Sequence, residues 1–178
     1  LAELVLSQGG NCFDWEGKQL IEYNEFTVDR EMAGNAQEYV DYVRALGGEQ
    51  YYEHAVDYGE WVEGGFGTSD AIVYKDNTLY VIDLKYGKGL QVFAEGNEQA
   101  QLYALGALDE WQFLTVEKVV IVIVQPRLDH IDEWETTPEQ LYKFGEYASQ
   151  QAEACMDEKS ERVPGEKQCK RCKAKATW

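Results

Sequence analysis

The chain has very little histidine and no long apolar run, and each scarcity excludes a class of protein. Its two histidines, His54 and His130, are far apart in sequence, so we expect no histidine-based catalytic site. No apolar run approaches the ~20 residues that span a membrane, and no signal peptide is evident. The glycine-rich segment 64–67 precedes an expected strand instead of opening a helix, so it does not fit a phosphate-binding loop. We expect a cytoplasmic protein without membrane association, and the missing initiator methionine indicates that the natural chain starts before Leu1.

Basic residues are also scarce. The 178 residues include 16 Lys and Arg against 33 Asp and Glu, for a net charge of −17. Six of the basic residues lie in the last 17 positions, where Glu166 is the only acid, so the remainder carries 10 basic and 32 acidic residues. A strongly negative surface disfavours nonspecific binding to a polyanion. Two interpretations stay open: a basic end that holds a polyanion while the acidic surface keeps the rest away, or acidity that serves solubility or high salt.

The apolar pattern predicts one α/β domain over residues 1–178, with a basic, cysteine-containing tail from about residue 162. A chain of this length with 44% hydrophobic residues suits a single core. Helices are predicted over 1–6, 27–46, 97–110 and 137–155, with Thr27, Asn97 and Thr137 as N-caps. Strands are predicted over 50–58, 67–75, 78–86, 118–125 and 129–135. The apolar stripe of the second helix includes Tyr39, which we therefore expect in the core.

The most informative segment is the run GTSDAIVYKDNTLYVIDLK, residues 67–85. It predicts two β-strands joined by a tight turn at Asp76-Asn77, because both flanking segments are rich in β-branched and aromatic residues. In a hairpin symmetric about this turn, Asp70 lies opposite Asp83. Side chains alternate between faces with period two, so Lys85 shares the face of both carboxylates.

Both faces of this hairpin are otherwise apolar, which favours a functional site over ordinary exposed edge charges. Strands that are apolar on both faces lie centrally in covered sheets, where unpaired charges are costly. Like charges on directly opposed residues repel, so Asp70 and Asp83 need a cation between them or a shared proton. A lysine beside them, Lys85, completes the residue set of a metal-dependent site that cuts phosphodiesters.

Three motifs together resemble the PD-(D/E)XK nuclease superfamily. They are Gly67-Thr68-Ser69-Asp70, then Ile82-Asp83-Leu84-Lys85, then Gln99 to Tyr103 in the sequence QAQLY. The closest likeness is to the RecB-like and phage exonuclease branch, which includes the Cas4 nucleases. There a G-x-x-D strand, a (D/E)-x-K strand and a Q-x-x-x-Y motif follow one another. The resemblance extends over most of the chain and implies a restriction-endonuclease-like core, a mixed central β-sheet flanked by α-helices.

The resemblance also implies a role for each motif residue. Asp70 and Asp83 would bind Mg²⁺ or Mn²⁺ together with the backbone carbonyl of Leu84. These oxygen ligands suit a hard cation that keeps water and substrate phosphate in its shell. Lys85 would orient or activate the attacking water and stabilise developing negative charge. The helix residues Gln99 and Tyr103 would contact the DNA or the reacting phosphate.

Further residues are candidates for the same site. Members of the superfamily often add a glutamate from an N-terminal helix, which makes Glu3 a possible metal ligand, and Glu53 is a second possible carboxylate. Lys88, in a turn after the second strand, would reach a phosphate of the bound strand. Each of the three has an ordinary alternative, a solvated surface charge.

The four cysteines raise a separate possibility. Several RecB-like nucleases and Cas4 proteins hold an iron–sulfur cluster with one N-terminal and three C-terminal cysteines. Cys12, Cys155, Cys169 and Cys172 resemble that layout, and four thiolates suit a 4Fe–4S cluster or Zn²⁺. Two features depart from the pattern: Cys155 precedes the C-x₂-C pair by a wide gap, and Trp178 stands near the place of the usual last cysteine. The alternative is buried or unpaired thiols, since a reducing cytosol disfavours disulfides.

These observations predict a divalent-metal-dependent DNA exonuclease. The phage-like resemblance implies action on linear duplex ends in recombination or end processing, in the cytoplasm of a host cell and beside a single-strand annealing protein. Lys170, Arg171 and Lys173 of the basic tail would contact the DNA. Two alternatives remain: a Cas4-like iron–sulfur nuclease, and a catalytically silent DNA-binding or interaction module with the same fold.

Overall fold

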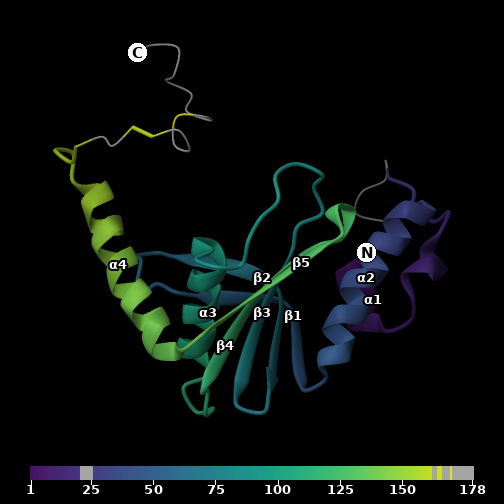
Figure 1. Ribbon diagram of the computed structural model, residues 1–178, viewed down its shortest axis with the longest axis horizontal. Helices are drawn as coiled ribbons and strands as arrows, with labels where there is room; N and C mark the ends of the chain where they lie inside the picture. Colours follow the sequence, from purple (N-terminus) through teal and green to yellow (C-terminus); the bar gives the residue numbers. More distant parts are fainter. Residues whose placement is uncertain (21–25, 162–163, 166–168, 170–178) are drawn as a thin grey trace.

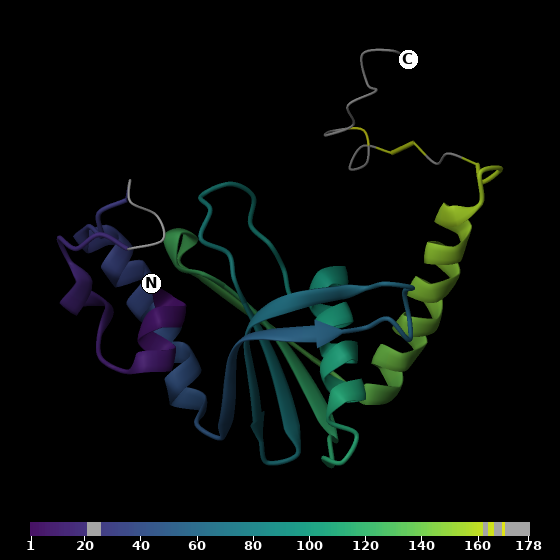
Figure 2. The same cartoon turned by 180° about the vertical axis from the view of Figure 1, so that it is seen from behind.

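A five-stranded mixed sheet runs through the middle of the molecule and carries helices on both faces (Figures 1 and 2). The computed structural model describes residues 1–20, 26–161, 164–165 and 169. The strands lie side by side in chain order: β1 (Glu49–Asp57), β2 (Phe66–Lys75), β3 (Thr78–Leu84), β4 (Lys118–Gln125) and β5 (His130–Thr136). Only β3 and β4 pair in parallel; the other neighbouring strands are antiparallel.

The helices form one layer on each face of the sheet. One layer contains α1 (Ala2–Gln8), the short 3₁₀ helix η1 (Cys12–Trp15) and α2 (Arg30–Leu46), and the other contains α3 (Glu98–Glu110) and α4 (Pro138–Met156). A second 3₁₀ helix, η2 (Pro126–Leu128), joins β4 to β5. This mixed α/β fold, with a five-stranded sheet and four flanking helices, confirms the predicted fold class and is consistent with a restriction-endonuclease-like core.

Side-chain caps fix where the helices begin, and one predicted cap was wrong. Asn97 and Thr137 accept hydrogen bonds from the N–H groups of Ala100 and Gln140, as predicted. Helix α2, however, starts at Arg30 behind the N-cap Asp29, which accepts from Met32. Thr27 instead pairs with Gln19 in an isolated β-bridge, so its backbone is extended by that contact and does not begin the helix.

The β2–β3 hairpin has the predicted register. Lys75 pairs with Thr78 and Tyr74 with Leu79. Asp76 and Asn77 both have positive φ, 48° and 57°, which is the backbone of a type I′ hairpin turn. The ladder of paired residues ends at Ala71 and Ile82, one position before Asp70 and Asp83 would meet. The two aspartates therefore lie where the strands stop pairing.

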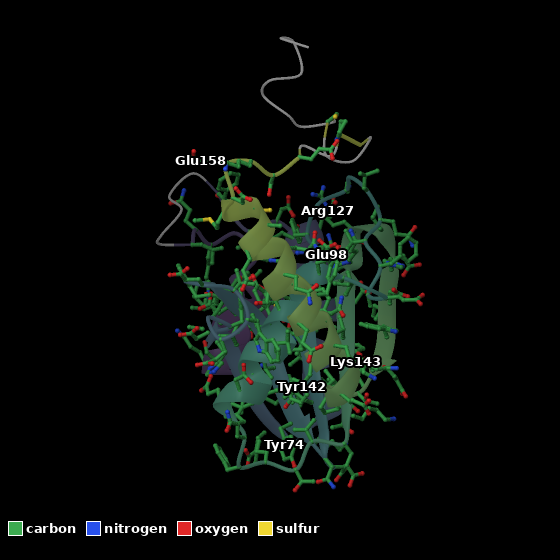
Figure 3. The ribbon with its side chains drawn as sticks, turned by 90° about the vertical axis from the view of Figure 1, so that its left-hand side faces the viewer. Tyr74, Glu98, Arg127, Tyr142, Lys143 and Glu158 are labelled. Carbon is green, nitrogen blue, oxygen red and sulfur yellow. The ribbon has the colours of Figure 1, made fainter. Side chains whose placement is uncertain are left out.

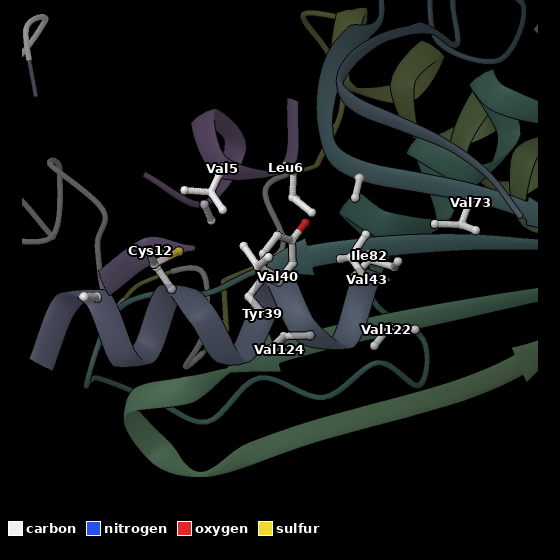
Figure 4. Close-up of a cluster of buried hydrophobic side chains, with 14 of the residues drawn as sticks. Val5, Leu6, Cys12, Tyr39, Val40, Val43, Val73, Ile82, Val122 and Val124 are labelled. Carbon is white, nitrogen blue, oxygen red and sulfur yellow. The ribbon is translucent and has the colours of Figure 1, made fainter. Parts of the chain in front are cut away.

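Apolar side chains fill the space between the sheet and each helical layer. Figure 4 shows the core on the α2 side, where Val5, Leu6, Tyr39, Val40 and Val43 meet residues of the sheet that include Val73, Ile82, Val122 and Val124. On the α3 side, Ile72, Leu79 and Val81 pack with Leu105, Leu108 and Trp111. Successive hairpin residues therefore alternate between the two cores, as the period of a strand requires. The central strands are therefore covered on both sides, and a charge at their ends lies close to the core.

Helix α4 completes the α3 layer with one apolar and one polar face. Leu141 is buried against α3, whereas Tyr142 and Lys143 lie on the outer surface of the helix (Figure 3). Lys143 forms an exposed ion pair with Glu139 one turn earlier, at 2.7 Å. Among the described residues, no helix is both long and apolar enough to cross a membrane.

Candidate active site

The carboxylate of Asp70, in the middle of β2, reaches across to the end of β3. Its Oδ2 atom accepts a hydrogen bond from the backbone N–H of Leu84 at 2.6 Å. The pKa of Asp70 is raised to about 6, first by burial and then by the charges of Asp83 and Glu53, against the lowering effects of the Leu84 N–H and of Lys85. Because burial destabilises the charged form of Asp70, a cation bound beside this carboxylate would be stabilising.

Asp83 and Lys85 form an ion pair beside Asp70. The Lys85 Nζ atom donates to Oδ1 of Asp83 at 3.0 Å and lies 2.8 Å from Oδ2. Asp83 is only 7% exposed, and its Oδ2 has the short ionic contact but no well-aligned hydrogen-bond donor among the described residues. The backbone N–H of Lys85 donates to Val124, so the lysine is held at the end of the β3–β4 pair.

Two residues of α3 extend this network. Lys85 Nζ also donates to Oε1 of Gln99 at 3.1 Å, and the amide of Gln99 donates to the hydroxyl of Tyr103 at 2.8 Å. The ring of Tyr103 fills the space that a Cβ atom at Gly67 would need, which explains a glycine at that position of β2. A continuous chain of contacts therefore runs from Asp83 through Lys85 and Gln99 to Tyr103.

The residues present fit a hard divalent cation. Asp70 and Asp83 supply two poorly solvated carboxylates against one lysine, and one oxygen of Asp83 still lacks an aligned donor. Within the part of the chain that the structure describes, no three histidine, cysteine, aspartate or glutamate side chains are grouped to enclose a metal. The protein would thus contribute two carboxylates, with the backbone, water and substrate completing the shell, as is common for Mg²⁺.

Glu53 lies on the other side of Asp70, in β1. The paired residues on either side of it, Tyr52 with Ala71 and His54 with Ser69, place it across from Asp70, although the two are not themselves paired. Its φ is +45°, a left-handed conformation that is strained for a residue with a Cβ. Burial and the charge of Glu3 raise the pKa of Glu53. Glu3 and Glu53, the two additional ligands predicted from the sequence, are therefore close enough for the charge of Glu3 to affect the pKa of Glu53. The charge of Glu53 in turn raises the pKa of Asp70.

The backbone conformation of Glu53 also changes which face β1 presents. Tyr52 packs in the α2-side core, whereas Val56 packs in the α3-side core. Residues four apart on a regular strand share a face, so the left-handed residue between them breaks the alternation. This break lies in the same row across the sheet as Asp70.

Residues 2–178 match the family described as "Protein of unknown function (DUF2800)". The chain belongs to the DUF2800 family. A solved structure titled "Crystal structure of SSO0001" is similar at 19% identity, with a TM-score of 0.37, over 72% of the DUF2800 chain and 59% of that chain. The DUF2800 chain thus spans about three fifths of that protein, and a likeness this loose carries no argument about fold or function.

Other predicted site residues of the DUF2800 chain lie elsewhere. Lys88 is exposed and forms an ion pair with Glu31 of α2 at 3.0 Å. Cys12 is buried under α2, whereas Cys155 is exposed near the end of α4, on the opposite side of the sheet (Figures 1 and 4). These two thiols therefore do not share a site. Cys169 is half-buried, and the remaining predicted residues, Lys170, Arg171, Cys172 and Lys173, lie outside the described residues.

Tyr39 is a neighbour of the site that the sequence predicts only as a core residue. Its ring is buried in the α2-side core, and its hydroxyl has no hydrogen-bond partner among the described residues. The pKa of Tyr39 is well above its ordinary value, because of burial and of the charges of Asp70, Asp83 and Glu53. The only signal in the sequence was a tyrosine, with its polar hydroxyl, in an otherwise apolar stripe.

Proposed function

We propose that this DUF2800 chain is a divalent-metal-dependent nuclease that hydrolyses phosphodiester bonds of DNA. The observation that carries the proposal is the linked arrangement of Asp70, Asp83, Lys85 and Gln99, where the pairing of β2 with β3 stops and α3 begins. These are the acidic, basic and amide groups that such chemistry needs, and the sequence motifs that predicted them resemble the PD-(D/E)XK nucleases.

The two aspartates would hold the cation. A divalent ion bound there would polarise a phosphoryl oxygen and lower the pKa of a nearby water. The raised pKa of Asp70 means that below about pH 6 a proton competes with the ion for this carboxylate. The burial of Asp83 keeps bulk water away from one side of the site.

Lys85 would stabilise negative charge as it develops on the phosphate. Its Nζ is already fixed by Asp83 on one side and Gln99 on the other. A charge that is oriented before the reaction costs no reorganisation during it. Gln99 acts as a positioning residue, since it connects the lysine to Tyr103 and to the helix that follows the site.

The finer parts of the proposal rest on the motif resemblance. We infer an exonuclease more readily than an endonuclease, acting on linear duplex ends in recombination or end processing, with a single-strand annealing protein as partner. The net charge of −17 supports a substrate held at a limited surface and not over the whole protein.

The test is digestion of end-labelled linear duplex DNA with Mg²⁺ or Mn²⁺, with an EDTA control. Lys85→Ala is compared with Lys143→Ala, a matched removal of an exposed lysine on α4. Metal-dependent shortening that Lys85→Ala abolishes and Lys143→Ala keeps supports the proposal. Absence of cleavage by the wild-type protein with both metals overturns it in favour of a silent DNA-binding module.

A further inference from the structure

The segment that joins β3 to α3 exposes two large apolar side chains. In this segment, residues 86–97 and called the β3–α3 loop below, Leu90 is 69% exposed and Phe93 is 57% exposed. The loop rises beyond the end of the sheet beside η2 (Figures 1 and 2). Scattered apolar residues on a surface are ordinary, so the position and support of these two decide whether they have a function.

Backbone groups of the loop bond to the body of the protein, although its charged side chains, Lys88 and Glu95, are exposed. The side chain of Gln125, only 2% exposed, accepts from the N–H of Val92 at 2.6 Å and donates to the carbonyl of Leu90 at 3.3 Å. The exposed Gln91 side chain bonds to His130, 2.8 Å from Nδ1. The loop backbone is therefore anchored to the protein, while Leu90 is exposed and Phe93, whose ring packs edge-on against that of His130 at 5.6 Å, is more than half exposed.

Two further contacts hold the loop from below. Nε2 of His130 lies 2.9 Å from the carbonyl of Val92, and the N–H of Ala94 donates to Oδ2 of Asp132 at 2.6 Å. The residues that support the loop thus come from the end of β4 and from β5. These hydrogen bonds fix the loop backbone next to both apolar side chains, so the fold itself determines that Leu90 and Phe93 are exposed.

The loop is continuous with the candidate site at both ends. It begins immediately after Lys85 and ends at Asn97, the N-cap of the helix that carries Gln99. The guanidinium of Arg127 lies over the ring of Tyr86 at 5.1 Å, which adds a cation at the base of the loop. The loop therefore rises from the site itself, and a strand bound at the site would lie beside it (Figures 1 and 2).

We propose that Leu90 and Phe93 form a wedge that stacks against the terminal base pair of a DNA duplex and separates its strands at the entrance of the site. This inference rests on the proposed function, because DNA is expected at the loop only if the neighbouring site binds a DNA strand. Apolar side chains unstack base steps when they insert between them, and an aromatic ring stacks on any base without sequence preference. One strand would continue to Asp70 and Asp83, and its complement would pass on the outer side of the loop.

Strand separation is tested with a blunt duplex that carries 2-aminopurine at its terminal position, in Ca²⁺ and with saturating protein. The variants are Leu90→Ser/Phe93→Ser and, as control, Phe113→Ser, since Phe113 is 80% exposed in the turn after α3. We expect a severalfold rise in fluorescence with the wild-type and control proteins and little rise with the double variant. An equal rise with the double variant, or no rise with bound wild-type protein, overturns the wedge.

Digestion separates the wedge from the proposed function. With Mg²⁺ we expect the double variant to degrade a blunt duplex at least tenfold more slowly than the wild-type protein, and to degrade a single strand or a duplex with an unpaired end at near wild-type rates. An equal loss on all three substrates contradicts the wedge and points to a structural or partner-binding role. If the wild-type protein degrades none of them, the proposed function fails, and the fluorescence result alone decides whether the loop opens a duplex.

Discussion

The backbone N–H of Leu84 donates to the carboxylate of Asp70 at 2.6 Å, where β2 and β3 have stopped pairing. In place of a further backbone ladder bond, a side chain of one strand binds the main chain of the other. One oxygen of Asp70 therefore bonds to the backbone of β3, and the other could bind a cation. It also places the Leu84 peptide, whose carbonyl the motif resemblance implies as a metal ligand, directly beside the two aspartates.

Replacement of Asp70 by asparagine is expected to stabilise the protein at neutral pH. The pKa of Asp70 is raised to about 6, so the native state binds more protons than the unfolded state between pH 4 and 6. The contribution of Asp70 to stability is present below its unfolded pKa and is lost as the pH rises through 6. At about 1.4 kcal/mol per pKa unit, Asp70→Asn should be more stable than the wild-type protein by roughly 1–3 kcal/mol at pH 8.

Urea denaturation at several pH values between 4 and 8 measures this difference without added metal. The gap between Asp70→Asn and the wild-type protein should close at pH 4. Asp76→Asn is the control, because Asp76 lies exposed in the hairpin turn with a positive φ that asparagine also accepts. A gap that does not depend on pH would show that the burial of Asp70 is not its cause.

Divalent cations are expected to stabilise the protein through Asp83. Ligand that binds only the native state raises stability by about 2.7 kcal/mol at a concentration of 100 times Kd. Mg²⁺ and Ca²⁺ should both raise the melting temperature of the wild-type protein, and Asp83→Asn should remove most of the shift. Ca²⁺ should not support cleavage, because its looser coordination positions water poorly. An unchanged Mg²⁺ titration in Asp83→Asn would rule out this ligand.

Gln99→Ala is expected to slow cleavage without loss of the fold. It removes one of the two groups that fix Lys85 and leaves the ion pair with Asp83. We expect a decrease of about 10–100-fold in kcat, since a positioned charge loses part of its orientation. Tyr103→Phe removes only the outer hydrogen bond and should have a smaller effect. Gln150→Ala, on the exposed side of α4, is the matched control, and equal activities of all three variants would refute the positioning role.

Gly67→Ala is expected to destabilise the protein. The ring of Tyr103 occupies the position of the new methyl group, and overpacking of this kind costs about 1–3 kcal/mol. Gly89→Ala is the control, because Gly89 has open space around its Cβ position. The measurement is the free energy of unfolding in urea, and Gly67→Ala/Tyr103→Leu should recover part of the loss. Similar stabilities for the two alanine variants would mean that the ring moves aside without cost.

Local chemistry made much of this arrangement predictable from the sequence. The Asp76-Asn77 turn defines the register of the hairpin, and that register brings Asp70 and Asp83 to the same row. Asn97 places Gln99 in the first turn of α3, within reach of Lys85. Thr27 was misjudged because two good capping residues stand two positions apart, and only the bridge to Gln19 decides between them.

Long-range packing determined what the sequence could not predict. The distance between Cys12 and Cys155 depends on the two helical layers lying on opposite faces of the sheet. The pairing of Lys88 with Glu31 joins a loop to a helix through two residues that are 57 positions apart. The exposure of Leu90 and Phe93 follows from the hydrogen bonds of Gln125, His130 and Asp132 to the loop. The loop sequence has no periodic pattern from which this exposure could be predicted.

The parallel β3–β4 connection has a consequence for the order of folding. Asp70 and Asp83 belong to a local hairpin, whereas the backbone N–H of Lys85 donates to Val124, which is possible only when β4 has paired with β3 after the crossover through α3. Non-local contacts of this kind form after local ones, because they close longer loops. We expect a refolding chain to acquire its carboxylate pair early and its oriented lysine late. If the proposed function holds, the docking of the crossover helix would be the folding step that completes the active site.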